Sequence, residues 1–266
     1  MKRDPRFLVW GILFVLLGGA GVSVSSIWRA KLDDPAALQL VLNIPANRLD
    51  VYEAGVRTRT YEVSVGKRPY NTPAGKYRIS SVVWNPWWHP PDSKWAEGRK
   101  PAPPGPTNPM GRVKLNFAPL LYIHGTTEED RLGAPASHGC VRMANGELIE
   151  LARLVHARTD TRVSSTVLDQ LVANPKMTRQ FQLRRSVPLT VVYDLVEVRD
   201  GHLVVHPDVY RKADQPTLQR EVMELLKKEG INVNALNREL VSRITMKRNA
   251  TRLEVPLETL ANGDGR

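Results

Sequence analysis

The single cysteine of this 266-residue chain, Cys140, lies in the stretch 137–142, which reads SHGCVR. A thiol becomes a useful nucleophile only as a thiolate, which requires a base, a positive charge or a helix N-terminus close by. His138 stands two residues before the cysteine, Arg142 stands two residues after it, and His124 lies further upstream. Because side chains alternate along an extended segment, His138 and Cys140 would point the same way. The pattern favours a cysteine nucleophile that is served by an imidazole base.

The backbone around these side chains is also suited to chemistry. Gly125 and Gly139 flank the histidine and the cysteine, and glycine permits close backbone approach and unusual dihedral angles. Consecutive amide N–H groups at Gly139 and Cys140 are suited to holding the oxyanion of a tetrahedral intermediate. Arg142 suits a substrate carboxylate, because its guanidinium group binds two oxygens at once. The alternative for Arg142 is an ion pair with an acidic residue of the following helix, Glu147 or Glu150.

Two other interpretations of Cys140 are open. The cysteine could be a small buried apolar residue, or it could bind zinc together with His124, His138 and, by residue type, His89. A single cysteine excludes an intramolecular disulfide and an all-cysteine metal site. Its polar neighbours argue against core packing and no fourth ligand stands out, so we expect neither a metal nor a cofactor. We expect the other histidines on the surface or in loops: His89, His156, His202 and His206.

The elements that must position these residues are mostly strands. Between residues 38 and 84, apolar residues alternate and are interrupted by turn residues, which predicts antiparallel strands. Further strands are expected at 113–117 and 120–125, and a helix at 145–157 with Asn145 as its N-cap or as a site residue. Beyond it we expect a helical segment within 159–186, a hairpin over 187–207 that turns at 199–201, and helices over 214–230 and 233–244.

Residues 85–111 have a different character, with many prolines and tryptophans and no periodicity. A structureless stretch of this length inside a domain is usually functional or disordered, and its tryptophans argue against disorder. We expect an ordered lid or cleft wall, in which Trp87 and Trp88 contact the substrate. The alternative is a surface loop that is pinned by its tryptophans, Trp95 included, and has no role.

The N-terminus predicts a membrane-associated segment. After the basic start MKRDPR, residues 7–28 carry no charge, and 22 helical residues would span about 33 Å, enough for the core of a bilayer. We expect either an uncleaved anchor or a cleaved signal peptide within residues 1–30. Either topology places the rest of the chain on the periplasmic side of the inner membrane.

The site residues closely resemble a family signature. Residues 122–147 read YIHGTTEEDRLGAPASHGCVRMANGE and resemble the motif of the L,D-transpeptidase catalytic domain of the YkuD/ErfK type. The stretches TPAGKYRI at 72–79 and PGPTNPMG at 104–111 resemble two further motifs of that family. The similarity covers about residues 38–157, and the hairpin 187–207 resembles extra strands of envelope members. Residues 157–186 depart from the family pattern.

The resemblance implies a fold and a division of the chain. The fold would be mainly β, a mixed β-sandwich of the L,D-transpeptidase type, with a helix beside the catalytic loop. The catalytic domain would cover 37–207 with its core at 38–157, between the N-terminal segment 1–30 and a helical C-terminal extension 208–266.

The resemblance also implies an activity. Cys140 would attack a peptidoglycan stem tetrapeptide, release D-alanine and form a thioester. An amine of a second stem, or of an envelope lipoprotein, would then accept the acyl group. His124 would be the base, oriented by a main-chain carbonyl near Gly125, and His138 would line the site. Ser137, Gly139 and Gly125 would shape the active-site loop, while the substrate-binding residues would be Arg142, Trp87, Trp88 and Asn145.

Other functions remain open at this stage. Water could resolve the thioester on the same scaffold, which would give an L,D-carboxypeptidase or an amidase, and a non-catalytic wall-binding protein would need no thiol at all. The formal net charge of +11 suits an anionic wall polymer. The basic residues are spread along the chain and match no nucleic-acid-binding pattern, so we expect no nucleic-acid partner.

Overall fold

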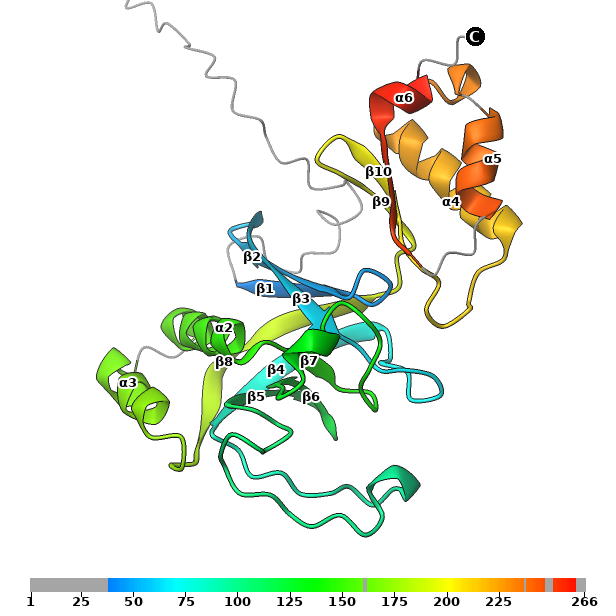
Figure 1. Cartoon of the computed structure of the whole chain (residues 1–266). Helices are drawn as coiled ribbons and strands as arrows, with labels where there is room; N and C mark the ends of the chain where they lie inside the picture. Colours follow the sequence, from blue (N-terminus) through cyan, green and yellow to red (C-terminus); the bar gives the residue numbers. More distant parts are fainter. Residues whose placement is uncertain (1–37, 160–161, 237, 247–250, 262–266) are drawn as a thin grey trace, which may run out of the picture.

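The computed structural model describes residues 38–159, 162–236, 238–246 and 251–261. These residues form a barrel with two helices at one side and a smaller C-terminal part, which lies at the upper right of Figure 1. None of the described helices is long and apolar enough to cross a membrane. The expected anchor or signal segment, 7–28, lies outside the described residues.

The mainly β prediction is confirmed, but the strands do not form a sandwich. In the described part of the chain, one sheet closes on itself in the order β1-β2-β3-β7-β6-β5-β4-β8. Closure comes from β1, which pairs antiparallel with β2 and parallel with β8. The strands are β1 (Gln39–Asn43), β2 (Arg48–Glu53), β3 (Val56–Ser64), β4 (Gly75–Trp84), β5 (Val113–Ala118), β6 (Leu121–Gly125), β7 (Val141–Met143) and β8 (Arg179–Val192).

Every second side chain along a strand points into the barrel and fills it, and the side chains between them lie outside. On β5, Val113 and Leu115 are fully buried, whereas Lys114 between them is only half-buried. The same period of two places Ile123 and Val141 in the core. The side chains between these core positions therefore lie on the outer face of the barrel.

Two helices cover one side of the barrel (Figure 1), as the pattern of apolar residues predicts. They are α2 (Asn145–Thr159) and α3 (Ser165–Ala173), and Asn174 is the C-cap of the second. His156 of α2 is buried, and its Nε2 accepts a hydrogen bond of 3.1 Å from the indole of Trp84. The prediction that His156 lies on the surface is therefore wrong, because α2 turns that position toward β4.

The long loop between β4 and β5 is ordered by two buried asparagines. The amide of Asn85 donates to three carbonyl oxygens at the end of α3 and beyond it, and that of Asn108 donates to three within the loop itself. The backbones of Trp88 and Ala102 pair with each other through two hydrogen bonds of 2.9 Å. The loop also contains the short helix η1 (Lys94–Ala96) and extends from the lower end of the barrel in Figure 1.

The C-terminal part has its own sheet and core. Strands β9 (Val196–Arg199), β10 (His202–Val205) and β11 (Leu253–Pro256) pair in the order β11-β10-β9. They share an apolar cluster with α4 (Gln215–Lys228), α5 (Arg238–Met246) and α6 (Leu257–Ala261). The side chain of Asp214 caps α4 by accepting a hydrogen bond from the backbone amide of Thr217.

The hairpin that we expected over 187–207 is divided between two sheets. It turns at Asp200–Gly201 as predicted, but its strands β9 and β10 pair with β11 in the C-terminal sheet and not with the barrel. Residues 187–192, which we expected to be part of the hairpin, are the end of the barrel strand β8. The extension is therefore mixed β and helical, because β11 completes a sheet that begins before residue 208.

Candidate active site

Three polar side chains form a row across neighbouring strands of the barrel. The register places Lys114 of β5 opposite His124 of β6, and His124 opposite Arg142 of β7. Directly opposed residues point to the same face of a sheet, and the alternation puts this row on the outer face. Cys140 stands immediately before β7 and two residues before Arg142, so it lies next to the same face of the sheet. Two of the residues that the sequence singled out thus come from neighbouring segments: His124 from β6, and Cys140 from the residue before β7.

His124 is held as a neutral base. Its Nδ1 lies 2.6 Å from the carbonyl oxygen of Gly125, so Nδ1 donates and the lone pair remains on Nε2. This is the main-chain contact that the family resemblance implies. The ring is buried, and burial lowers the pKa of His124 to about 4, an effect that the charges of Arg142 and Lys114 reinforce. At neutral pH the imidazole is therefore uncharged and able to accept a proton.

Cys140 is a free, half-buried thiol. Its Sγ donates a weak hydrogen bond of 3.4 Å to the carbonyl oxygen of Leu120 in the β5–β6 turn. Burial raises the pKa of the thiol, while a backbone hydrogen bond at Tyr122 and the positive charges of Arg142 and Lys114 act in the opposite direction. The resting thiol at neutral pH is therefore protonated.

The loop before the thiol is shaped by Ser137. The Ser137 hydroxyl donates to the carbonyl oxygen of Cys140 and accepts a 3.1 Å hydrogen bond from the amide of Gly139. Gly139 has a φ of +112°, a conformation that favours glycine. We expected the amides of Gly139 and Cys140 to share the oxyanion. The amide of Gly139 is instead committed to Ser137 within the loop.

His138 lies in an aromatic setting. Trp95 stacks on its ring with centroids 4.1 Å apart and an angle of 9° between planes, and Tyr70 meets it edge-on at 4.9 Å. Burial, reinforced by nearby positive charges, lowers the pKa of His138. The loop between β4 and β5, which we expected to be a lid, thus contacts the site through Trp95. Of the tryptophans we expected there, Trp87 is exposed and stacks on His89, and Trp88 closes the base of the loop.

Arg142 has a carboxylate partner within the protein. Its Nη1 lies 2.6 Å from Glu128 Oε2, and the arginine side chain is largely buried. The expected partners Glu147 and Glu150 are not used, because the loop between β6 and β7 brings Glu128 closer. Arg142 therefore contributes a positive charge near Cys140 while it is paired with Glu128.

Asn145 fastens three segments beside His124. Its Oδ1 accepts from the amide of Arg112 at 2.8 Å, and its Nδ2 donates to the carbonyl oxygen of Thr126 at 2.6 Å. A Cβ at Gly125 would lie 2.2 Å from that Oδ1, so only glycine fits there. Helix α2 starts at Asn145 itself, and the first helical carbonyl is that of Ala144. Asn145 is therefore a structural clasp and not an N-cap.

Sequence reasoning missed several residues of the site. Lys114 occupies an outward position on a strand, and that alternation was the one signal that could have found it. Thr72 begins the stretch TPAGKYRI that resembles a family motif, but its contact with Gly139 was not foreseen, and Tyr70 and Tyr210 belong to no local pattern that points to Cys140. Within the described ranges, no group of three or more His, Cys, Asp or Glu side chains is placed to hold a metal ion.

Comparison with known proteins identifies the family of the chain. Residues 38–167 match the family model of the L,D-transpeptidase catalytic domain, YkuD. The chain is 31% identical over 134 residues to "Putative L,D-transpeptidase YkuD" of Bacillus licheniformis, which covers 50% of the chain and 68% of that protein. It is 31% identical over 199 residues to "Probable L,D-transpeptidase YbiS" of Escherichia coli K12, covering 67% of the chain and 64% of that protein. The chain belongs to the L,D-transpeptidase family of the YkuD type.

Among solved structures, an L,D-transpeptidase from Mycobacterium smegmatis is similar, with 16% identity, a TM-score of 0.37 and coverage of 59% of each chain. The family match ends at residue 167, so β8 and the C-terminal part lie beyond it.

Proposed function

We propose that this protein is a cysteine-dependent peptidoglycan L,D-transpeptidase. The observation that supports it best is the register that places His124 of β6 opposite Arg142 of β7, two residues after Cys140, with Nδ1 of His124 donating to the Gly125 carbonyl. That bond leaves Nε2 as the basic nitrogen, which a thiol nucleophile requires. The family match agrees with this chemistry.

The proposed reaction has two halves. In the first, Nε2 of His124 takes the proton of the Cys140 thiol as Sγ attacks the carbonyl carbon between the third stem residue and the terminal D-alanine. The C–N bond breaks, the imidazolium returns the proton to the leaving amine, and a thioester remains. In the second half an acceptor amine attacks the thioester carbonyl carbon and loses a proton to His124. The C–N bond forms as the C–S bond breaks, and the imidazolium returns the proton to the departing thiolate, which restores the thiol.

The positive groups around the thiol support the developing thiolate. Arg142 and Lys114 both favour the ionised form of Cys140. Because the amide of Gly139 is committed to Ser137, we assign the oxyanion to the amide of Cys140. His138, with Trp95 and Tyr70, forms the wall next to the nucleophile.

The partners follow from this activity. The donor is a peptidoglycan stem peptide, and the acceptor is the amine of a second stem or of an envelope lipoprotein. The net charge of +11 suits an anionic wall polymer. We propose that the catalytic part works on the periplasmic side of the inner membrane, reached through an anchor in residues 7–28 or through a cleaved signal peptide.

The test compares purified wild type with Cys140→Ala on disaccharide-tetrapeptides, with and without an acceptor amine. We expect wild type to release D-alanine and form cross-linked dimers, and Cys140→Ala to do neither. Release of D-alanine without dimers would instead assign a hydrolase. Wild type that forms no product, or no carbapenem adduct on Cys140 by mass spectrometry, would contradict the proposal.

A further inference from the structure

The C-terminal part contacts the back of the catalytic loop through one side chain. Tyr210 lies in the strap 206–213 that connects β10 to α4, and it is buried. Its hydroxyl donates a 2.7 Å hydrogen bond to the carbonyl oxygen of Gly66 and accepts one of 2.9 Å from the amide of Thr72. Both backbone groups belong to the loop between β3 and β4. Tyr210 thus fixes two points of that loop at once.

Thr72 carries the contact on to the residue before the nucleophile. Its hydroxyl donates to the carbonyl oxygen of Gly139 at 2.9 Å and accepts from the amide of Gly66 at 2.8 Å. The Thr72 side chain is fully buried, so this geometry cannot be exchanged for water. A continuous chain of hydrogen bonds therefore runs from Tyr210 through Thr72 to Gly139, one residue from Cys140.

The backbone is close-packed at this point. Gly66 forms a β-bridge with Ser137, and the amide of Lys67 donates to the Ser137 carbonyl at 2.9 Å. A Cβ on Gly66 would lie 2.0 Å from the carbonyl oxygen of Tyr70 and 3.0 Å from the Cα of Gly139. With no free space between the two loops, a shift of one moves the other.

The strap itself is held rigidly. The Tyr193 hydroxyl donates to Asp208 at 2.5 Å and accepts from the amide of Tyr210 at 2.7 Å, and the two tyrosine rings stack. Asp208 also accepts from the amides of Lys212 and Ala213. The position of the Tyr210 ring is therefore fixed, and a residue that positions another group requires this.

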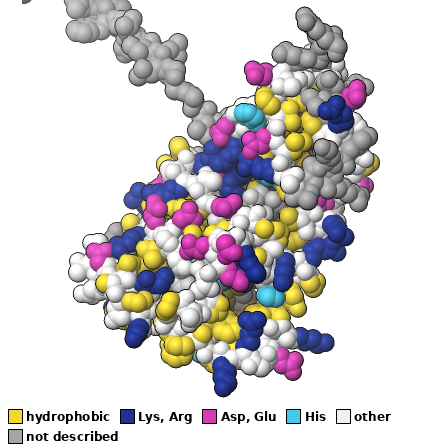
Figure 2. Space-filling model, in the orientation of Figure 1, with side chains coloured by type: hydrophobic (Ala, Val, Ile, Leu, Met, Phe, Trp, Pro, Cys, Tyr) yellow, Lys and Arg dark blue, Asp and Glu magenta, His cyan; other side chains and the backbone are white. Residues whose placement is uncertain are grey.

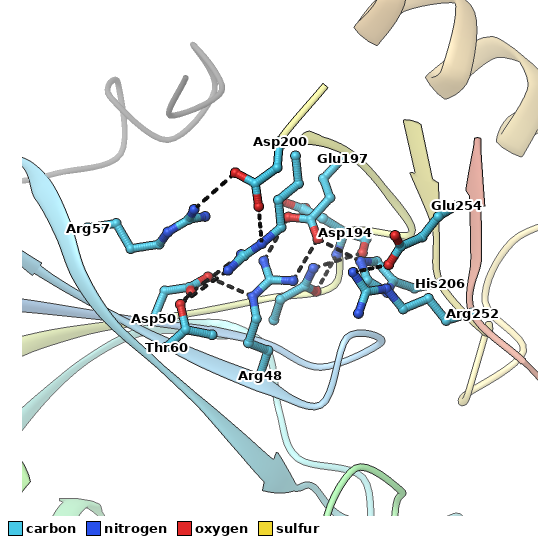
Figure 3. Close-up of polar contacts among 12 residues, drawn as sticks. Arg48, Asp50, Arg57, Thr60, Asp194, Glu197, Asp200, His206, Arg252 and Glu254 are labelled. Carbon is cyan, nitrogen blue, oxygen red and sulfur yellow. Dashed lines mark hydrogen bonds and ion pairs between the residues drawn. The ribbon is translucent and has the colours of Figure 1, made fainter. Parts of the chain in front are cut away.

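A buried ionic junction fixes where the strap begins. Glu197 of β9 accepts two hydrogen bonds from Arg48 of the barrel strand β2, at 2.6 and 2.7 Å, and one of 2.9 Å from His206 (Figure 3). All three residues are buried, so His206 lies in a loop, one of the two places that we expected, but not on the surface. Figure 2 shows basic and acidic side chains side by side where the two parts meet. Loss of one partner would leave a buried charge unpaired, so the junction opposes separation of the two parts.

We infer that Tyr210 is a positioning residue for Cys140, and that the C-terminal part orients the nucleophile of the barrel through Thr72 and Gly139. The inference rests on the proposed function, in which Cys140 is the nucleophile. It assigns a role to a part of the chain that lies beyond the family match.

The test uses the full chain with Tyr210→Phe, which removes the hydroxyl and keeps the ring. Tyr61→Phe is the matched control, because Tyr61 is equally buried and its hydroxyl has no hydrogen-bond partner in the described structure. Cys140 is the only thiol, so iodoacetamide alkylation reports on it alone and needs no peptide substrate. We expect Tyr210→Phe to slow alkylation at neutral pH and to move its pH profile upward, while Tyr61→Phe matches wild type.

Turnover supplies the second readout. We expect kcat on the tetrapeptide to fall about tenfold in Tyr210→Phe with KM little changed, because the thiol is displaced and the substrate contacts are not. Thr72→Val should reproduce the loss and Thr72→Ser should restore it. The double variant Tyr210→Phe/Thr72→Val should be no slower than Thr72→Val alone, since both act through one chain.

The outcomes separate the two proposals. If alkylation and kcat of Tyr210→Phe equal those of Tyr61→Phe, or if Thr72→Val and Thr72→Ser behave alike, the inference is overturned. A wild type that turns over no stem peptide, yet whose alkylation depends on Tyr210, would reject the transpeptidase and keep the positioning contact. If Tyr210→Phe fails to fold, the Thr72→Val and Thr72→Ser pair decides.

Discussion

The indole of Trp95 lies flat on the imidazole of His138, with ring centroids 4.1 Å apart, and this contact joins the long lid to the loop that carries the thiol. Burial is the first cause of the lowered pKa of His138. We therefore expect Trp95→Ala to raise the pKa of His138 toward 6.5, its ordinary value, in an NMR titration of the histidine ring. Trp95→Phe retains an aromatic cover and should shift it less. An unchanged His138 titration in Trp95→Ala would show that the lid does not shield this ring.

The pH dependence of kcat/KM should report the burial of His124. The base acts only when neutral, and burial lowers its pKa to about 4. Activity should therefore persist as the pH falls through 6.5 and be lost only as the pH approaches 4. The measurement is kcat/KM on a tetrapeptide across the acidic range, with circular dichroism to confirm that the fold survives. An acidic limb centred near 6.5 would assign the proton to a more exposed histidine.

Arg142 should act through its charge. Its guanidinium favours the thiolate of Cys140 while it is paired with Glu128. In Arg142→Met the positive charge is gone, so we expect the pH profile of Cys140 alkylation to move to higher pH. Arg142→Lys keeps the charge, so its pH profile of Cys140 alkylation should lie between those of Arg142→Met and wild type. If Arg142→Met changes KM and leaves the alkylation profile where it was, Arg142 binds substrate instead.

Gly125 should tolerate no side chain. In Gly125→Ala the new methyl group meets Oδ1 of Asn145 at 2.2 Å, so we expect the free energy of unfolding to fall by about 1–3 kcal/mol and turnover to fall with it. The control is Gly146→Ala in the first turn of α2, where nothing lies within 4 Å of the new Cβ. Helix propensity should make that variant up to about 1 kcal/mol more stable. Equal denaturant midpoints for the two variants would contradict the clasp.

The buried junction between barrel and C-terminal part should make stability depend on acid. Burial alone would raise the pKa of Glu197, but hydrogen bonds from His206 and Arg48 outweigh it and hold that pKa well below the ordinary range. The stability that this carboxylate contributes is present above about pH 4.3, its unfolded pKa, and is lost as the pH falls below that value.

Glu197→Gln tests the junction. The variant leaves Arg48 without its bidentate partner, so we expect a loss of about 3 kcal/mol at pH 7 and a flatter dependence of stability on acid. The control is Glu254→Gln, which breaks an exposed ion pair with Arg252 and should change stability by less than about 1 kcal/mol. Urea unfolding at several pH values measures both. A wild type and a Glu197→Gln variant with the same pH dependence would contradict the assignment.

The local sequence determined which residues of one segment could perform chemistry and where most helices and strands form. The spacing around Cys140 placed a thiol, His138 and Arg142 in one segment, and alternation and capping residues predicted most strands, α2, α3 and α4. These features depend on neighbours along the chain, so one sequence is enough to show them.

Tertiary structure alone decided which elements meet. The barrel closes because Leu40 pairs with Leu189, and the C-terminal sheet is completed by β11, some fifty residues after β10. Alternation determines which side chains of a strand share a face, but it does not determine which other strand pairs with it. For the same reason the partners of the site residues were not predictable: Glu128 for Arg142, Trp95 for His138, and Tyr210 for Thr72. Each of these contacts joins segments whose approach is set by packing of the whole chain and not by any local pattern.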